Sequence, residues 1–197
     1  TIYTNYNSST NGILNRNNGT ASTPNYVTPT QPNQPGTFGM ATNIKQDPLN
    51  PSIVYFGRRP DVFKSSNFFT AASPTYTKLS NFFGAPYSVS TNQLVRALAI
   101  APTNPNFIYA ALTPFYDPPL SNDNYRVFMT SVGGGISNWQ DISPTVSALL
   151  SVTGIAVSDR DPSHIWITYS GYDPSVKVKE YKSGVWTDIS QGLPNVP

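Results

Sequence analysis

The sequence predicts an all-β fold, a β-propeller with about three four-stranded blades and a partial blade, forming part of a larger propeller. Polar turns that contain Asn-Pro or Asp-Pro recur at Pro51, Pro105 and Pro162, which lie about 55 residues apart. Each turn joins an apolar strand to a second strand that ends in an aromatic residue. No segment of useful length shows the 3.6-residue apolar period of a helix.

Two further elements recur in the same order in every repeat. A third strand is predicted after each turn unit, and a closing signature follows it in which an aromatic residue precedes Leu-Ser or Ile-Ser. The third strands are predicted at residues 61–64, 126–129 and 177–181, and the closing signatures at residues 76–80, 139–143 and 186–190. Each repeat therefore holds four short strands, which is the content of one propeller blade.

The repeats divide the chain into five segments. Residues 1–20 are expected to supply the outer strands of a preceding partial blade, in which Ile2-Tyr3 pairs with residues 12–16. Residues 21–37 hold four prolines and are predicted to be a crossing loop without a strand, because proline cannot donate to a β-ladder. The three blades with their following connections are predicted at residues 38–93, 94–151 and 152–197. Because so few blades do not readily close a ring, we expect the propeller to continue beyond this chain.

Composition limits the classes of partner. Charged residues are 11% of the chain, against about 25% in an average globular domain. The net charge is +2, and Arg58-Arg59 is the sole adjacent basic pair, so nucleic acid is not an expected partner. No apolar run is long enough to insert in a membrane. Cysteine is absent, which excludes disulfides and thiolate metal sites.

With these repeats in view, residues 38–190 resemble the BNR/Asp-box propeller superfamily, closest to secreted bacterial surface propellers and more distantly to sortilin-like, sialidase and xyloglucanase-type ones. Residues 98–111 followed by 127–143 match the family repeat best. The Asp-box at residues 131–139 is degenerate, since Gly133 stands where the family has Asp. The resemblance implies an extracellular or cell-surface location. It also implies that this box is a structural hairpin and that Trp139 and Trp186 pack between blades.

Catalytic groups are sparse. Sialidases of this fold use three clustered arginines, but the arginines here are scattered and no motif groups three of them. A glycoside hydrolase could work with two carboxylates, for which the candidates are Asp61, Asp117, Asp123 and Asp173. The single histidine, His164, precedes a strand and is expected to be structural, and one histidine cannot make a multi-histidine metal site. No catalytic residue, metal or cofactor is predicted.

The loops between the second and third strands are the predicted ligand site, because such loops share the end of a propeller where ligands usually bind. Tyrosine rings in these loops could stack on sugars or on a protein partner, with hydroxyl groups available for hydrogen bonds. The candidate ligand-binding residues are Arg58, Arg59, Asp61, Tyr116, Asp117, Tyr125, Tyr172 and Asp173. The competing interpretation is that Tyr-Asp-Pro is simply a favourable turn sequence.

Three functions remain open at this point. The favoured one is a non-catalytic extracellular propeller module that binds a protein or glycan at these loops, or a structural part of a larger surface or secreted protein. A fragment of a propeller glycoside hydrolase that uses two aspartates is the main alternative. An intracellular scaffold propeller is the third.

Overall fold

The computed structural model is built of β-strands joined by turns and loops, and its described residues form no helix. It describes the backbone of residues 2–5, 13–17 and 26–27, and the backbone and side chains of residues 43–90, 93–114, 125–145, 150–170 and 176–194. These residues contain no helix that is long and apolar enough to cross a membrane.

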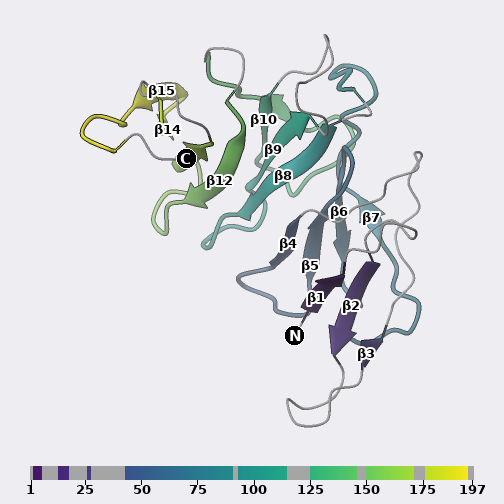
Figure 1. Cartoon of the computed structure of the whole chain (residues 1–197). Helices are drawn as coiled ribbons and strands as arrows, with labels where there is room; N and C mark the ends of the chain where they lie inside the picture. The colour runs from purple at the N-terminus through teal and green to yellow at the C-terminus, as the bar shows by residue number, and fades with distance from the viewer. Residues whose placement is uncertain are drawn as a thin grey trace.

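Three four-stranded antiparallel sheets follow one another along the chain, and we call them the first, second and third blade (Figure 1). The first blade contains β4 (Asn43–Gln46), β5 (Val54–Gly57), β6 (Val62–Ser65) and β7 (Thr77–Lys78). The second contains β8 (Gln93–Ile100), β9 (Ile108–Pro114), β10 (Arg126–Thr130) and β11 (Gln140–Asp141). The third contains β12 (Val152–Val157), β13 (Ile165–Tyr169), β14 (Val178–Lys182) and β15 (Val185–Asp188). Strands that are consecutive in the chain are neighbours in each sheet, which confirms the predicted four-stranded blades.

A smaller sheet of three strands precedes the blades. It contains β1 (Ile2–Asn5), β2 (Ile13–Asn17) and β3 (Tyr26–Val27), and β1 pairs with β2 as predicted. The prediction that residues 21–37 contain no strand is wrong, because Val27 pairs with Arg16. Tyr26 and Val27 are β-favouring residues that lie between the prolines of this segment, so their own N–H groups are available for pairing.

The recurring Pro-containing turn has the same hydrogen bonds in all three blades. At its ends, the N–H of Asp47 donates to the carbonyl of Ile53, Ala101 to Phe107, and Ser158 to His164, all at 2.9 to 3.0 Å. An inner hydrogen bond closes each turn from Ile53 to Asn50, Phe107 to Asn104, and His164 to Asp161. The turn therefore recurs in the sequence because it fixes the pairing of the first two strands of each blade.

The closing Ser explains why the outer strands are shorter than predicted. Beyond the β-ladder, the hydroxyl oxygens of Ser80, Ser143 and Ser190 accept hydrogen bonds from the N–H groups of Val62, Val127 and Val178 at 2.9 to 3.0 Å. The same three valines accept a backbone hydrogen bond from the residue before the Ser. In each blade, the serine side chain thus replaces one backbone hydrogen bond of the β-ladder at the start of the third strand.

Two apolar cores lie between successive blades. The core between the first and second blades includes Phe82, Phe128 and Trp139, and the core between the second and third includes Tyr109, Ile167 and Tyr181. Strand β8 contacts both β4 and β12, so the first strands of the blades lie side by side. This arrangement confirms that the two signature tryptophans pack between blades, with Trp139 6% exposed.

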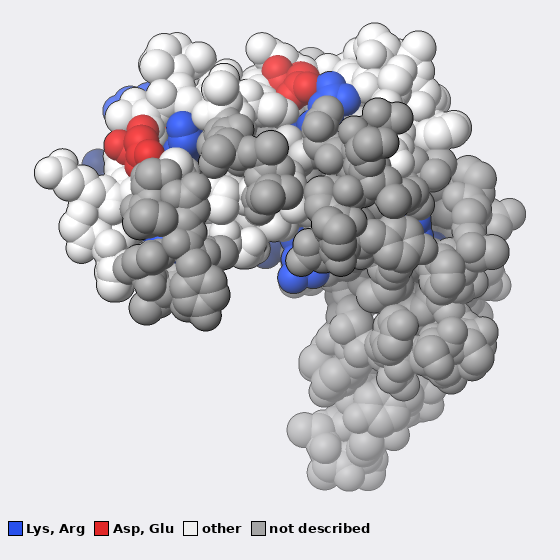
Figure 2. Space-filling view, turned by 45° about the horizontal axis from the view of Figure 1, so that its top comes forward, with Lys and Arg blue, Asp and Glu red and all other residues white. Residues whose placement is uncertain are grey.

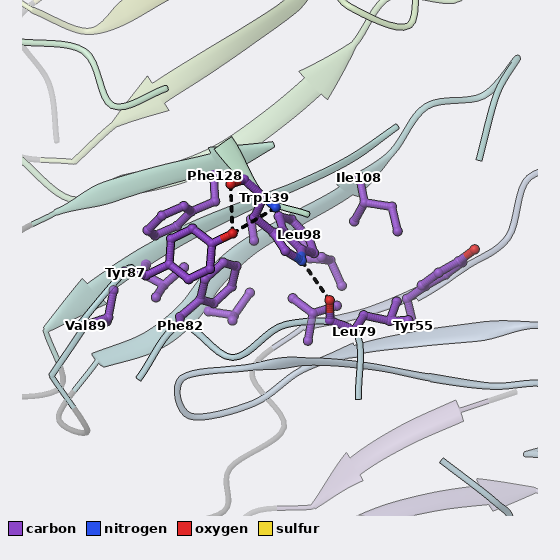
Figure 3. Packing of buried hydrophobic residues seen from close by; sticks show 13 residues of the cluster. Tyr55, Leu79, Phe82, Tyr87, Val89, Leu98, Ile108, Phe128 and Trp139 are labelled. Atoms are coloured by element: carbon purple, nitrogen blue, oxygen red, sulfur yellow. Dashed lines mark hydrogen bonds between the residues drawn. The ribbon is translucent and has the colours of Figure 1, made fainter. Parts of the chain in front are cut away.

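The tryptophans also hold the blades together through a repeated hydrogen bond. Trp139 Nε1 donates to the carbonyl of Leu79 in the preceding blade at 2.7 Å (Figure 3). Trp186 Nε1 likewise donates to the carbonyl of Ile142 at 2.6 Å. Leu79 and Ile142 are the residues before the closing Ser of their blades. The closing signature of the second blade therefore supplies both an indole donor to the blade before it and a carbonyl acceptor to the blade after it.

Candidate functional site

The strand ends that flank the predicted ligand loops lie at one end of the three blades. The pairing register places the ends of the second strands, Gly57, Pro114 and Tyr169, opposite the beginnings of the first strands. The backbone N–H of Val95 donates to the carbonyl of Arg58 at 3.3 Å, which joins this end of the first blade to that of the second. The strand ends that flank the three loops thus lie at the same end of the blades as the beginnings of the first strands.

The loop of the first blade is tightly turned. The N–H of Arg58 donates to the carbonyl of Asp61 at 2.7 Å, and the bond between Arg59 and Pro60 is cis. Arg58 is 5% exposed, and burial lowers the pKa of its guanidinium. Arg59 is half-buried. Of the two arginines predicted to bind a ligand, Arg59 is therefore the more accessible one.

Asp61 is part of the framework. It is 1% exposed, and its carboxylate accepts hydrogen bonds from the Ser80 hydroxyl at 2.9 Å and the Phe82 N–H at 2.8 Å. Lys78 Nζ lies 2.8 Å from its second oxygen. These contacts use the carboxylate to hold the end of β7 and the chain that follows it, so we leave Asp61 out of the proposed ligand surface.

The second blade contains the same ion pair with its charges exchanged. Arg126, directly before Val127, occupies the position of Asp61 directly before Val62, and Asp141 occupies the position of Lys78 in the closing signature. Arg126 Nε donates to Asp141 at 2.9 Å, and a second guanidinium nitrogen donates to the carbonyl of Tyr87. Comparing these two positions across repeats is a sequence signal that could have assigned Asp61 to the framework.

Half of the predicted ligand residues fall outside the described part of the chain. These are Tyr116, Asp117, Tyr172 and Asp173, together with Asp123 from the glycoside hydrolase alternative. Tyr125 is described, and it is half-buried directly before β10. In the structure, Arg59 and Tyr125 lie at the loop end of neighbouring blades.

Most described carboxylates hold turns. Asp47 accepts hydrogen bonds from the N–H groups of Leu49 and Asn50, and its other oxygen accepts one from the hydroxyl of Tyr55. Asp141, Asp161 and Asp188 each accept a hydrogen bond from the N–H of a serine two residues later, at 2.8 to 2.9 Å.

These hydrogen bonds also set the acidity of the turn aspartates. Hydrogen bonds from the serine two residues later lower the pKa of Asp161 and of Asp188. Burial would raise the pKa of Asp141, but the hydrogen bonds from Ser143 and Arg126 outweigh it and the net shift is downward. A general acid in glycoside hydrolysis needs the opposite shift, so these three carboxylates are unsuited to that role.

The single histidine pairs with the single glutamate. His164 Nε2 lies 2.7 Å from Glu180 Oε1, and its ring packs on Trp166 with centroids 4.2 Å apart. Within the described ranges, no three His, Cys, Asp or Glu side chains gather to form a metal site. His164 thus has the structural surroundings that the sequence predicted.

The sequence did not reveal that the first strands of two blades carry a β-bulge at the same place. The register shifts between Val95 and Ala97 in β8 and between Val152 and Gly154 in β12. The bulged residues, Arg96 and Thr153, are exposed at the loop end of the blades. Bulges redirect side chains near functional sites, so Arg96 joins Arg59 as an accessible polar group there.

The visible surface charge is mixed. On the face shown in Figure 2, acidic side chains lie beside basic ones in two places, and most of the described surface is uncharged. The face shown therefore presents no large field of one sign that would select for a polyanion.

Comparisons with known proteins identify a fold and no family. No protein-family model matches the sequence, and no curated protein matches it. Among solved structures, an ancestral GH74 enzyme aligns with a TM-score of 0.60 and 18% identity over 93% of this chain. The chain spans 23% of the length of that enzyme. At this identity the likeness shows the fold alone, and with the three stacked four-stranded sheets it shows that the chain is part of a β-propeller.

Two other structures align more loosely. A GH74 enzyme from Niastella koreensis gives a TM-score of 0.39 and 16% identity, with 80% of this chain and 31% of that chain covered. YCF48 bound to a D1 peptide gives a TM-score of 0.33 and 12% identity, with 93% of this chain and 63% of that chain covered.

Proposed function

We propose that this chain is part of a non-catalytic, extracellular β-propeller that binds a glycan or a protein at the loop end of its blades. The observation that carries the proposal is that its described polar residues fall into two groups, one that holds turns and strands and one that is accessible. The described aspartates with hydrogen-bond partners cap turns or brace strands, whereas accessible Arg59, Arg96 and Tyr125 gather at one end. Such an end suits recognition through hydrogen bonds and ring stacking.

The experiment compares tyrosine variants with controls at the opposite end of the blades. Binding of the purified chain is measured on an array of immobilised polysaccharides and sialosides and, in parallel, on a displayed peptide library. Tyr116→Ala and Tyr172→Ala are expected to weaken capture of the selected ligand at least about tenfold, as loss of a stacking ring does. Leu49→Ala and Val132→Ala alter exposed apolar side chains of the opposite turns and should leave capture unchanged.

Two results would contradict this function. One is an unmodified chain that captures nothing on either surface. The other is an equal loss of capture in the tyrosine variants and in the opposite-end controls, which would indicate general adhesion. The extracellular location has its own test, since a secretion signal in the gene is expected and its absence would argue for an intracellular scaffold.

A glycoside hydrolase remains the second candidate, because the aligned GH74 enzyme shares the fold over 93% of this chain. The carboxylates left for such chemistry are Asp117, Asp123 and Asp173. Release of reducing ends from the polysaccharides of the array, abolished by Asn at one of these positions, would establish hydrolysis. Binding without release would support the non-catalytic module.

A further inference from the structure

The outward face of the third blade repeats a surface that is buried twice elsewhere in the molecule. Strand pairing places Trp166, Val178 and Ile189 on this face, because Ile167 and Tyr181, which alternate with them, are in the core against the second blade. The equivalent residues are Tyr55, Val62 and Leu79 in the first blade and Tyr109, Val127 and Ile142 in the second.

Burial separates the third blade from the other two. Those six equivalent side chains are between 0% and 6% exposed. In contrast, Ile189 is 41% exposed, while Trp166 and Val178 are half-buried. The third blade thus presents the apolar side of a blade interface without a blade against it among the described residues.

The hydrogen-bond framework of that interface is also in place. The N–H of Ile189 donates to the carbonyl of Val178 at 3.1 Å, as Leu79 does to Val62 and Ile142 to Val127. This geometry holds the residue before the closing Ser with its own carbonyl turned to the next blade. In both interfaces of the structure, that carbonyl accepts the indole N–H of a tryptophan, at 2.6 and 2.7 Å.

The polar groups on the face are already paired within the blade. His164 is paired with Glu180, and the hydroxyls of Thr153 and Thr168 lie 2.9 Å apart. Burying the face would therefore leave few polar groups without hydrogen-bond partners. Such unsatisfied groups are the usual obstacle to covering a mixed surface.

We infer that this face is the docking surface for a further four-stranded blade, whose closing-signature tryptophan donates to the carbonyl of Ile189. The occupant is defined by two complementary features: an apolar sheet face for Trp166, Val178 and Ile189, and an indole N–H next to the end of β15. Tyr76 occupies the tryptophan position of the first blade, so a second copy of this chain offers no indole at that position. The inference that a further blade docks on this face does not depend on which ligand the loops bind.

A duplication tests the inference. Residues 191–197 are replaced by a second copy of residues 144–194, which joins the new blade at the point where Ser143 and Ser190 are equivalent. The chain has no cysteine, so Ile189→Cys gives a single thiol whose rate of alkylation reports exposure of the face. We expect this thiol to react at least about tenfold more slowly in the extended chain than in the original, because reaction then requires local opening.

Matched variants separate docking from misfolding. Leu49→Cys, which is exposed far from the junction, should react equally fast in both chains, and Ile142→Cys should react slowly in both. Replacing the copy of Trp186 in the added blade by phenylalanine should restore part of the reactivity of the Ile189→Cys thiol, because it removes the indole donor.

Two outcomes would overturn the inference. In the first, the Ile142→Cys thiol is protected in the extended chain while the Ile189→Cys thiol reacts as fast as in the original. In the second, the Ile189→Cys thiol already reacts slowly in a dimer of the original chain, which would show that a second copy occupies the face.

Discussion

The two blade interfaces share one hydrogen-bond framework but are packed differently. Between the first and second blades, Phe82 stacks on Phe128 with centroids 4.4 Å apart and meets Trp139 edge-on at 5.1 Å. Between the second and third blades, alanines on β8 and β9 face the third blade, and Tyr181 with Trp186 forms the ring contact at 5.0 Å. The indole-to-carbonyl hydrogen bond is present in both.

The difference comes from a segment that is not repeated. Residues 81–90 link the first two blades and fold into their interface, where the Tyr87 hydroxyl donates to the Trp139 carbonyl at 2.8 Å and accepts from its N–H at 2.9 Å. In addition, Gly134 lies against Leu79 with φ of +97°, and an added Cβ would come within 2.9 Å of the leucine Cβ. The repeat therefore determines how blades are joined, and the intervening segments determine how densely they pack.

Removing the two indoles should break the first interface more severely than the second. Trp139→Ala is expected to lower the free energy of unfolding by about 4 kcal/mol, since it deletes a buried ring and its hydrogen bond. Trp186→Ala should cost about 2 kcal/mol, because that ring is half-buried and has a looser setting. Urea unfolding followed by tyrosine fluorescence or circular dichroism measures both. Equal losses would show that the hydrogen bond, and not the packing, dominates each interface.

The exchanged ion pairs offer a second contrast. Asp61→Ala should cost about 3 kcal/mol, because it leaves the Phe82 N–H and the Ser80 hydroxyl without their buried acceptor. Asp141→Ala should cost about 1 kcal/mol, since the Asp141 side chain is 35% exposed and water can replace it as the partner of Arg126. Urea midpoints give the comparison. If Asp61→Ala left stability unchanged but abolished ligand capture, Asp61 would belong to the ligand-binding surface and not to the framework.

The repeats made much of the fold predictable from sequence. The turns, the closing serines and both tryptophans are explained by hydrogen bonds that recur from blade to blade. The strand at Tyr26–Val27 was missed because two residues between prolines give no period to detect. The role of Tyr87 was also missed, since a residue that occurs in one connection leaves no repeated signal.

The ligand site was less predictable than the fold. Loop position could be inferred from strand order, but burial depends on which neighbouring segment covers a side chain. For this reason Arg58 and Asp61, although close in sequence to half-buried Arg59, are 5% and 1% exposed. The bulges that expose Arg96 and Thr153 depend on a register shift between two strands, which alternation of apolar residues does not encode.

Acid should weaken the closing turns, with the smallest effect of the three. Hydrogen bonds lower the pKa of Asp141 and of Asp188 in the folded chain, so each group contributes stability above the unfolded aspartate pKa of about 3.9 and loses it as the pH falls through the folded value. Asp141 accepts hydrogen bonds from both Ser143 and Arg126, whereas Asp188 accepts its hydrogen bond from Ser190. We therefore expect Asp141→Asn and Asp188→Asn each to flatten the fall in urea midpoint between about pH 5 and pH 2.5, a range that brackets the aspartate pKa. If neither variant changes that slope, the acid sensitivity arises elsewhere, and the turn hydrogen bonds contribute equally to both protonation states.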